Sequence, residues 1–279
     1  MKLERYDQNP ILTPNPDQHW EAGAVFNAGA SIGPDGRVMM LYRAIDADYH
    51  PFPDRPGYAN YVSRVGLATS TDGKNFERQP DPVMVPEEGI DPYGCEDPRV
   101  NAVTLDGRTT WFVTYSALHE PAFSGDHVRI GLAQTDDFKT YRKLGVIGPD
   151  VFDRNAVLFP DRVNGKLTLI HRAGSDVQIA YFDDLEHLLN PGPDFWPEYL
   201  ASIDEHKLLT QVYEWEAKRI GAGCPPLYTP QGWLLIYHGV DVNHVYRAGI
   251  ALLDLGDPAR VIARSPEPIL TPELDYERV

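Results

Sequence analysis

The residues best suited to chemistry lie in one short stretch, Tyr93-Gly94-Cys95-Glu96-Asp97-Pro98-Arg99, just before the strand-like residues 100–103. Two adjacent carboxylates raise each other's pKa, so this pair is costly to leave without partners. The proline after Asp97 favours an extended backbone at that aspartate, which would fix the direction of its side chain. The plain alternative is a charged turn ahead of a strand.

Cationic and polar side chains recur where other strand-like segments begin or end. They are Asn27, Arg43, Arg154, Asn155, His171, Arg172 and His238. Guanidinium groups and a histidine gathered around one point suit phosphate, because the guanidinium fork matches phosphate oxygens. Taken singly, Arg154 fits a surface turn, and each histidine fits a core position. No histidine pair repeats a metal-binding spacing beside a carboxylate, so we expect no metal site.

An internal repeat indicates which elements position these side chains. One phrase occurs at three places, Asn9-Pro10-Ile11-Leu12-Thr13-Pro14, Asp81-Pro82-Val83-Met84-Val85-Pro86 and Glu267-Pro268-Ile269-Leu270-Thr271-Pro272. Short strand-like segments at residues 24–27 and 29–32 follow the first copy. Asp-Gly or Asn-Gly between apolar runs, as at Asp35-Gly36 and Asn164-Gly165, then predicts hairpins. An apolar strand with an acidic turn comes after each hairpin.

Four strands in each unit indicate an all-β fold and a β-propeller. Four units are recognised by their strand ends, Arg43, Tyr115, His171 and His238. The third copy of the phrase indicates the start of a fifth unit. We therefore expect a five-bladed β-propeller that forms a single catalytic domain over residues 1–279. The sequence stops near the place where the innermost strand of the fifth blade should begin. Either N-terminal segments close the fifth blade or the chain is truncated, and of the two we expect an incomplete blade in a truncated chain.

The inner strands of a propeller line a central channel, so residues near their starts converge on one axis. In this interpretation the converging residues are Asn27, Asp97, Arg154 with Asn155, and Cys224 with Pro225. The sequence therefore predicts one carboxylate among several cations.

Composition limits the partners of the protein. The 279 residues include 25 Lys and Arg against 41 Asp and Glu, a net charge of −16. Nucleic acid and anionic membranes require a basic face and are not expected, whereas a small anionic substrate needs only a local cluster. Two cysteines without disulfide or metal spacing, and no apolar signal or membrane segment, predict a cytoplasmic protein. A homo-oligomer is left open.

Helical content is expected to be small. We expect a helix at Leu185–Leu189 before a proline-rich loop, and a turn at residues 204–209. Residues 45–61 are too long for a simple hairpin, and loops of that length are usually functional or disordered.

Taken together, the motifs resemble glycoside hydrolase family 130, the β-mannoside phosphorylases and their relatives, which are five-bladed propellers. The similarity runs along nearly the whole chain. The phrases that carry it are Val25-Phe26-Asn27-Ala28-Gly29-Ala30, Leu41-Tyr42-Arg43-Ala44, Ser63-Arg64-Val65-Gly66-Leu67-Ala68, Cys95-Glu96-Asp97-Pro98-Arg99, Arg154-Asn155-Ala156-Val157-Leu158-Phe159-Pro160, His171-Arg172, Tyr237-His238-Gly239-Val240 and Tyr246-Arg247-Ala248-Gly249.

The resemblance implies inverting phosphorolysis of a β-mannoside to α-mannose 1-phosphate and an acceptor sugar. It implies that Asp97 is the general acid, with its proton relayed through the 3-hydroxyl of the mannosyl unit. Inverting hydrolases use a second carboxylate to activate water, but here inorganic phosphate would be the nucleophile and no cofactor is expected. The implied phosphate ligands are Arg154, Asn155, Arg172, His238 and Tyr246. The expected substrate contacts are Asn27, Arg43, Arg64, Glu96, Arg99 and His171.

Several alternatives stay open at this point. The substrate could be a β-1,4-mannosyl-glucose, a mannooligosaccharide or a mannosyl-N-acetylglucosamine. The same fold could instead support a β-mannosidase that uses water, or a sugar-binding propeller without activity. Residues 45–61 and 194–215 are expected to border the acceptor sugar, where aromatic side chains stack well on sugars.

Overall fold

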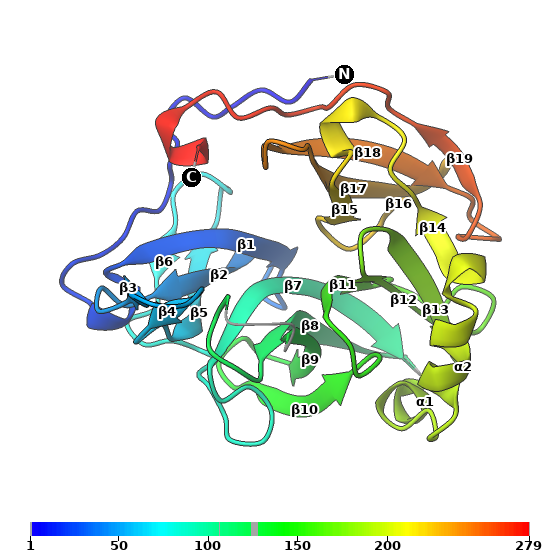
Figure 1. Ribbon diagram of the computed structural model, residues 1–279, viewed down its shortest axis with the longest axis horizontal. Coiled ribbons are helices and arrows are strands. Elements are labelled where there is room, and N and C mark those ends of the chain that lie inside the picture. Colours follow the sequence, from blue (N-terminus) through cyan, green and yellow to red (C-terminus); the bar gives the residue numbers. More distant parts are fainter. Residues whose placement is uncertain (1, 106, 124–127, 279) are drawn as a thin grey trace. The chain divides into compact units, whose positions relative to one another are not determined.

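The structure, a computed structural model, describes residues 2–105, 107–123 and 128–278 and consists mostly of β-sheet with few helices (Figure 1). The chain divides into two compact units. The N-terminal unit is Gln8–Phe152, and the C-terminal unit is Asp153–Val279 together with Met1–Asp7. The prediction of a mostly β protein is confirmed.

The N-terminal unit contains two groups of antiparallel strands, sheets I and II. Sheet I is formed by β1 (Ala24–Ile32), β2 (Val38–Ile45), β5 (Ser63–Ser70) and β6 (Glu77–Arg78). Sheet II is formed by β7 (Gly94–Leu105), β8 (Arg108–Leu118), β9 (Val128–Thr135) and β10 (Arg142–Ile147). A parallel bridge from Ser63 to Gly94 joins the two into one eight-stranded sheet. The predicted long loop at residues 45–61 contains a small hairpin of β3 (His50–Pro51) and β4 (Tyr58–Ala59).

The C-terminal unit also contains two antiparallel sheets. Sheet III is formed by β11 (Asp153–Leu158), β12 (Leu167–Ala173), β13 (Val177–Phe182) and β14 (Lys207–Leu209). Sheet IV is formed by β15 (Arg219–Ala222), β16 (Leu227–Thr229), β17 (Gly232–Val240), β18 (Tyr246–Leu253) and β19 (Val261–Arg264). Short 3₁₀ helices lie at His19–Glu21 in the N-terminal unit and at Ile203–His206, Glu214–Glu216 and Asp275–Glu277 in the C-terminal unit.

Two α-helices follow β13 and lie beside it (Figure 1). Helix α1 (Leu185–Leu189) confirms the predicted helix, and the Asp184 side chain caps it by accepting a hydrogen bond from the His187 backbone. Helix α2 (Phe195–Ala201) was wrongly predicted as part of a loop, because of the prolines around it. Pro197 lies in the first turn of α2, where a backbone N–H has no helical partner to lose.

The first strand of three sheets carries the same bulge. The strand register shifts between Phe26 and Gly29 in β1, and at the corresponding points of β7 and β11. Residues 24–27 and 29–32 are therefore one bulged strand and not the two short strands predicted. At each bulge one polar residue adopts a left-handed backbone, with φ values of 50° at Asn27, 54° at Asp97 and 57° at Asn155. The predicted extended backbone at Asp97 is wrong, since the bulge overrides the local preference of a residue before proline.

A buried tyrosine, carboxylate and cation hold sheet I to the segment that precedes it. The Tyr42 hydroxyl donates to Glu21, at 2.7 Å, and Arg78 pairs with the same carboxylate at 2.9 Å. The Tyr42 ring covers Gly66 on the neighbouring strand, where a Cβ would lie 2.3 Å from the ring. Burial and the hydrogen bond to Glu21 raise the pKa of Tyr42, so its hydroxyl stays a donor.

The same arrangement recurs in sheet IV, and sheet II shares its buried ion pair. In sheet IV the Tyr237 hydroxyl donates to Glu216 at 3.2 Å, and Arg264 contacts that carboxylate at 2.7 Å. In sheet II a buried ion pair of 2.6 Å joins Asp91 to Lys143. The sequence repeat also includes a Trp-Glu pair ahead of sheets I and IV, a signal that the sequence analysis missed.

The repeated proline-rich phrase closes the sheet before it. Met84 bridges to Val65 in sheet I, and Leu270 bridges to Ala248 in sheet IV. In the C-terminal unit the backbone of Leu3 also donates to Ile269, so the N-terminal segment lies beside the C-terminal segment (Figure 1).

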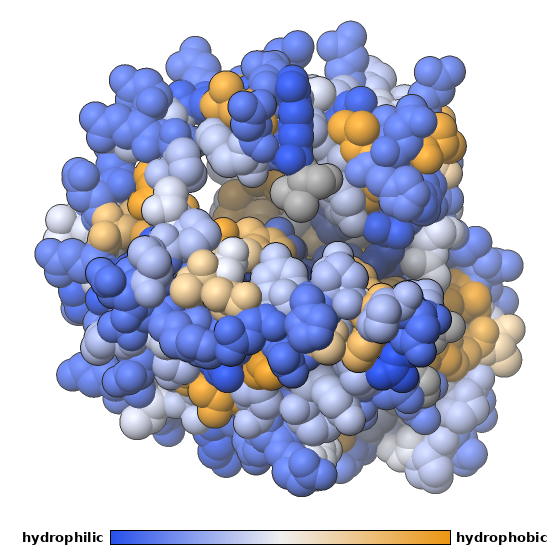
Figure 2. Space-filling model, turned by 60° about the vertical axis from the view of Figure 1, so that its left-hand side comes forward, coloured by the Kyte–Doolittle hydropathy of each residue, from blue (hydrophilic) through white to orange (hydrophobic). Residues whose placement is uncertain are grey.

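Hydrophilic side chains dominate the face shown in Figure 2, in agreement with the composition. Hydrophobic side chains appear there in small groups. No helix in the described part of the chain is both long and apolar enough to span a membrane.

The Glu216 carboxylate provides a direct test of the recurring arrangement. Glu216→Gln leaves Arg264 without its buried counter-charge, so the free energy of unfolding should fall by about 3 kcal/mol. The matched control Asp183→Asn removes the exposed pair with Lys166 and should cost less than about 1 kcal/mol. Urea unfolding measures both variants. Equal losses would show that the buried arrangement adds no stability.

Candidate active site

Asp97 lies at the bulge of β7, and two donors fix its carboxylate. The Asn27 side-chain amide donates to Oδ1 at 2.7 Å, and the Arg43 guanidinium contacts the same oxygen at 3.1 Å. The Asp97 side chain keeps 11% of its surface exposed. Strands β1, β2 and β7 thus bring together the predicted residues Asn27, Arg43 and Asp97.

The second carboxylate of the motif is a buried support. Glu96 is fully buried and pairs with Arg43 at 2.6 Å, and it also accepts a hydrogen bond of 2.9 Å from the Tyr61 hydroxyl. Arg43 therefore bridges both carboxylates, and its guanidinium lies 4.5 Å from the centre of the Phe26 ring. Two adjacent carboxylates repel each other and are unfavourable without partners. One buried guanidinium, that of Arg43, balances both negative charges.

Two further arginines of the predicted substrate-binding set also contact protein groups. Arg99 donates to the backbone oxygens of Asp97 and Pro98, at 3.3 and 3.2 Å, and so supports the bulge. Arg64 pairs with Asp46 at 3.1 Å and keeps about a quarter of its side chain exposed. Glu96 and Arg99, both predicted to contact substrate, make these supporting contacts within the protein.

Aromatic rings gather at the small hairpin of residues 45–61. The Tyr58 ring packs edge-on against Tyr49 and Phe123, with ring centres 5.6 Å apart in each case. Tyr61 joins this group and connects it to Glu96 through its hydroxyl. The loop of residues 45–61 therefore holds a group of aromatic rings that a hydrogen bond joins to the acidic motif.

A cluster of cations forms in the C-terminal unit around Arg172. Arg154 on β11 and Arg172 on β12 are cross-strand partners, and Arg172 is only 5% exposed. Burial, followed by the charges of Arg154 and Arg219, lowers the pKa of Arg172 to about 10. Its Nε has no hydrogen-bond partner among the described residues. Three guanidinium groups held this close are expected to attract an anion, which would offset their mutual repulsion.

Asn155 and His238 meet at a glycine in the same unit. A Cβ on Gly221 would lie 2.7 Å from the Asn155 Oδ1 and 2.8 Å from the His238 Nε2. Gly221 is the cross-strand partner of His238 in sheet IV, so the absent side chain leaves room for both polar groups.

Tyr246 completes the cluster together with a residue that the sequence analysis missed. The Arg219 guanidinium donates to the Tyr246 hydroxyl at 2.6 Å, and the His238 ring lies 5.7 Å from the Tyr246 ring. Cys224 and Pro225 were predicted as the fourth converging position, but the first strand of sheet IV is β15, which begins at Arg219. The position of Arg219 at the start of that strand was the available signal.

His171, a predicted substrate contact, lies in the interior of the C-terminal unit. It is fully buried, and its ring nitrogens lie 2.7 Å from Asp153 and 2.9 Å from the Tyr199 hydroxyl. The structure therefore gives His171 a supporting position next to Arg172.

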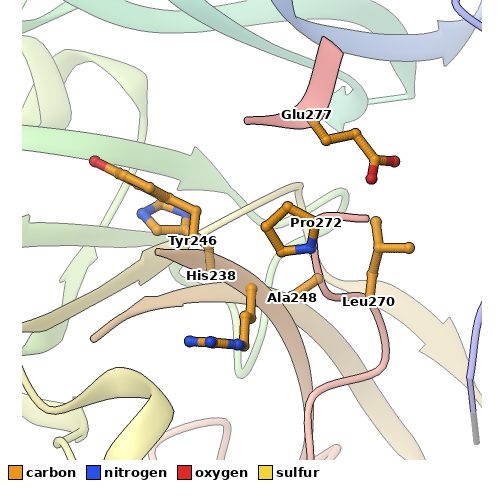
Figure 3. Close-up of a pocket in the computed structure, with 7 residues that line it drawn as sticks. His238, Tyr246, Ala248, Leu270, Pro272 and Glu277 are labelled. Carbon is orange, nitrogen blue, oxygen red and sulfur yellow. The ribbon is translucent and has the colours of Figure 1, made fainter. Parts of the chain in front are cut away.

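A cavity of about 230 Å³ opens beside this cluster (Figure 3). Figure 3 shows His238 and Tyr246 next to each other, with Pro272 and the Glu277 carboxylate on the other side of the view. The lining residues are His238, Tyr246, Arg247, Ala248, Leu270, Pro272 and Glu277. Within residues 2–105, 107–123 and 128–278, no group of three or more His, Cys, Asp or Glu side chains could hold a metal ion.

Gly221→Ala tests whether Asn155 and His238 act on a common anion. The new methyl group must displace one of them, so the affinity for inorganic phosphate should fall about tenfold, the effect of roughly one charge-assisted hydrogen bond. The control Gly256→Ala places a methyl group at an ordinary contact distance of 3.6 Å and should leave affinity unchanged. Isothermal titration with phosphate measures both. Unchanged affinity in Gly221→Ala would contradict this assignment.

The sequence and the structure are similar to known proteins. The profile of glycoside hydrolase family 130, described as β-1,4-mannooligosaccharide phosphorylase, matches residues 2–279. A 1,2-β-oligomannan phosphorylase of Thermoanaerobacter sp. strain X514 is 39% identical over 279 residues, covering 100% of this chain and 85% of that protein.

Two solved structures are also similar. A β-1,2-mannobiose phosphorylase from Listeria innocua, in complex with β-1,2-mannobiose, has a TM-score of 0.75 at 27% identity and covers 98% of this chain and 85% of its own. Another has a TM-score of 0.78 at 25% identity and covers 98% of this chain and 81% of its own. It is described as evidence that the family of mannoside phosphorylases contains hydrolases that target β-1,2 linkages in Candida mannan.

Proposed function

Because the chain belongs to glycoside hydrolase family 130, the family of the β-mannoside phosphorylases, we propose that it splits β-mannosides with inorganic phosphate. The observation that carries this proposal is the cationic cluster around Arg172. A hydrolase of the inverting type needs a carboxylate to activate water. The charge of Asp153 acts on Arg172, and its two oxygens already accept from His171 and from the Arg172 backbone. Glu277, which lines the neighbouring cavity, pairs with Arg5 at 2.7 Å.

In the proposed reaction a phosphate oxygen attacks the anomeric carbon as the glycosidic bond breaks. Attack from the face opposite the leaving group converts a β-mannoside to α-mannose 1-phosphate. The leaving oxygen takes up a proton that comes from Asp97, relayed through the 3-hydroxyl of the mannosyl unit. Asn27 and Arg43 orient the Asp97 carboxylate for this step.

Phosphate binding is assigned to the C-terminal unit. Arg154, Arg172 and Arg219 supply positive charge, and Asn155, His238 and Tyr246 supply further polar groups at the same cluster. The guanidinium groups match phosphate oxygens in shape and charge. Phosphate is a co-substrate in this proposal, and no cofactor takes part.

The overall architecture is proposed to be a five-bladed β-propeller that forms one catalytic domain. Sheets I to IV supply four blades, and the phrase that begins at Glu267 starts the fifth. The repeated sheet pattern, and the TM-score of 0.75 to the Listeria enzyme, support this proposal. A cytoplasmic location and an absence of nucleic-acid or membrane partners remain predictions from the sequence.

The substrate is proposed to be a β-1,2-linked mannooligosaccharide. The relative at 39% identity acts on 1,2-β-oligomannan, whereas the family profile is described by a β-1,4 activity. Initial rates on β-1,2-mannobiose and β-1,4-mannobiose with phosphate should favour the β-1,2 substrate. A higher kcat/KM for the β-1,4 substrate would overturn this part of the proposal.

Phosphate dependence tests the reaction class. The rate of β-mannoside cleavage should rise with phosphate concentration and approach zero in its absence. A β-mannosidase is the second candidate, because the family contains hydrolases according to one of the similar structures. Cleavage at an equal rate without phosphate would establish the hydrolase instead.

Asp97→Asn tests the proton donor. The amide keeps an acceptor for Asn27 but supplies no acidic proton, so turnover should fall by at least about 100-fold while the fold is retained. Asp35→Asn, which removes an exposed ion pair with Arg37, is the matched control and should retain full activity. A folded Asp97→Asn protein with normal turnover would exclude Asp97 as the acid.

A further inference from the structure

Sheet III departs from the arrangement that the other sheets share. In sheets I, II and IV a tyrosine on the second strand faces a glycine on the third, in the pairs Tyr42–Gly66, Tyr115–Gly131 and Tyr237–Gly249. In sheet III the corresponding pair is His171 and Gln178. The exception occurs in the sheet that carries the cross-strand pair Arg154 and Arg172.

The histidine of sheet III belongs to a buried chain of hydrogen bonds. Its Nδ1 lies 2.7 Å from Oδ2 of Asp153, and its Nε2 lies 2.9 Å from the Tyr199 hydroxyl. Tyr199 comes from helix α2 and also contacts the backbone oxygen of Ile179 at 3.1 Å. Asp153 and His171 are fully buried, and Tyr199 is 5% exposed. This chain connects α2 to the first two strands of the sheet.

Asp153 attaches this chain to the cationic cluster. The residue directly precedes Arg154, and its Oδ1 accepts the backbone N–H of Arg172 at 3.0 Å. In sheets I and IV the buried carboxylate comes from a 3₁₀ helix ahead of the sheet, whereas in sheet III it lies on β11 itself. The negative charge is therefore built into the strand that carries Arg154.

The two arginines need such a support because their charges repel each other. The β11 register shifts directly after Arg154, so ladder hydrogen bonds alone hold this part of the strand weakly. Asp153 counteracts this through its hydrogen bond to the Arg172 backbone and through its charge. Asp153 thus supports the Arg172 backbone, while the Nε of the Arg172 side chain has no hydrogen-bond partner among the described residues.

We propose that Asp153, His171 and Tyr199 are positioning residues that hold Arg154 and Arg172 in the geometry that binds phosphate. The proposal rests on the phosphorylase function proposed above, because it assigns the network to the phosphate half of that reaction. These residues act through the arginines and touch no reacting atom.

Tyr199→Phe is the primary test, because it removes one hydroxyl and preserves the aromatic packing of α2. The affinity for inorganic phosphate, measured by isothermal titration, should fall about three- to tenfold, and the KM for phosphate should rise to match. The kcat at saturating phosphate should change less than the KM. Asp153→Asn removes the charge as well and should weaken phosphate binding by more than tenfold.

Tyr42→Phe is the matched control, since it removes an equally buried tyrosine hydroxyl that donates to Glu21 in sheet I. Thermal unfolding should show comparable destabilisation of Tyr42→Phe and Tyr199→Phe, with phosphate affinity reduced only in the latter. Equal phosphate affinity in wild type, Tyr199→Phe and Asp153→Asn would overturn the network proposal alone. A wild type that binds phosphate but cleaves mannosides equally well without it would overturn the phosphorylase proposal alone.

Discussion

The candidate site depends on a bulge near the start of the first strand of a sheet. The bulge places one residue in the left-handed backbone region, and that residue is Asn27, Asp97 or Asn155 in the three sheets that carry it. Residues other than glycine are uncommon in this region, although asparagine and aspartate tolerate it best. The same bulge thus sets the side-chain direction of the proposed acid in one sheet and of a proposed phosphate ligand in another.

Buried charge is balanced differently in the two groups of candidate residues. Around Asp97, one guanidinium from Arg43 satisfies two carboxylates. Around Arg172, positive charge exceeds negative charge. The Asp153 carboxylate contacts His171 and accepts a hydrogen bond from a backbone N–H, so its oxygens bind neither guanidinium in these two contacts. Burial, followed by the charges of Arg154 and Arg219, lowers the pKa of Arg172. The repulsion among these charges is costly for the folded protein, but it creates the positive potential that an incoming phosphate can satisfy.

Much of this arrangement could be predicted from the sequence, because hairpin turns, strand repeats and short motifs are local signals. Asp97, Arg154 and Arg172 were identified in this way. Other features depend on pairings that local signals do not contain. The backbone of Asp97 follows the bulge and not its neighbouring proline, and Arg219 was missed because the first strand of sheet IV was expected several residues later. The contact from His171 to Tyr199 joins two residues 28 positions apart, and Tyr199 lies on a helix in a proline-rich segment.

The central claim is that phosphate, and not water, attacks the anomeric carbon. Phosphorus and proton NMR of the products formed from β-1,2-mannobiose in phosphate buffer tests it most directly. We expect α-mannose 1-phosphate and free mannose in equal amounts from the first turnovers. Two molecules of free mannose for each disaccharide, with no sugar phosphate, would contradict it.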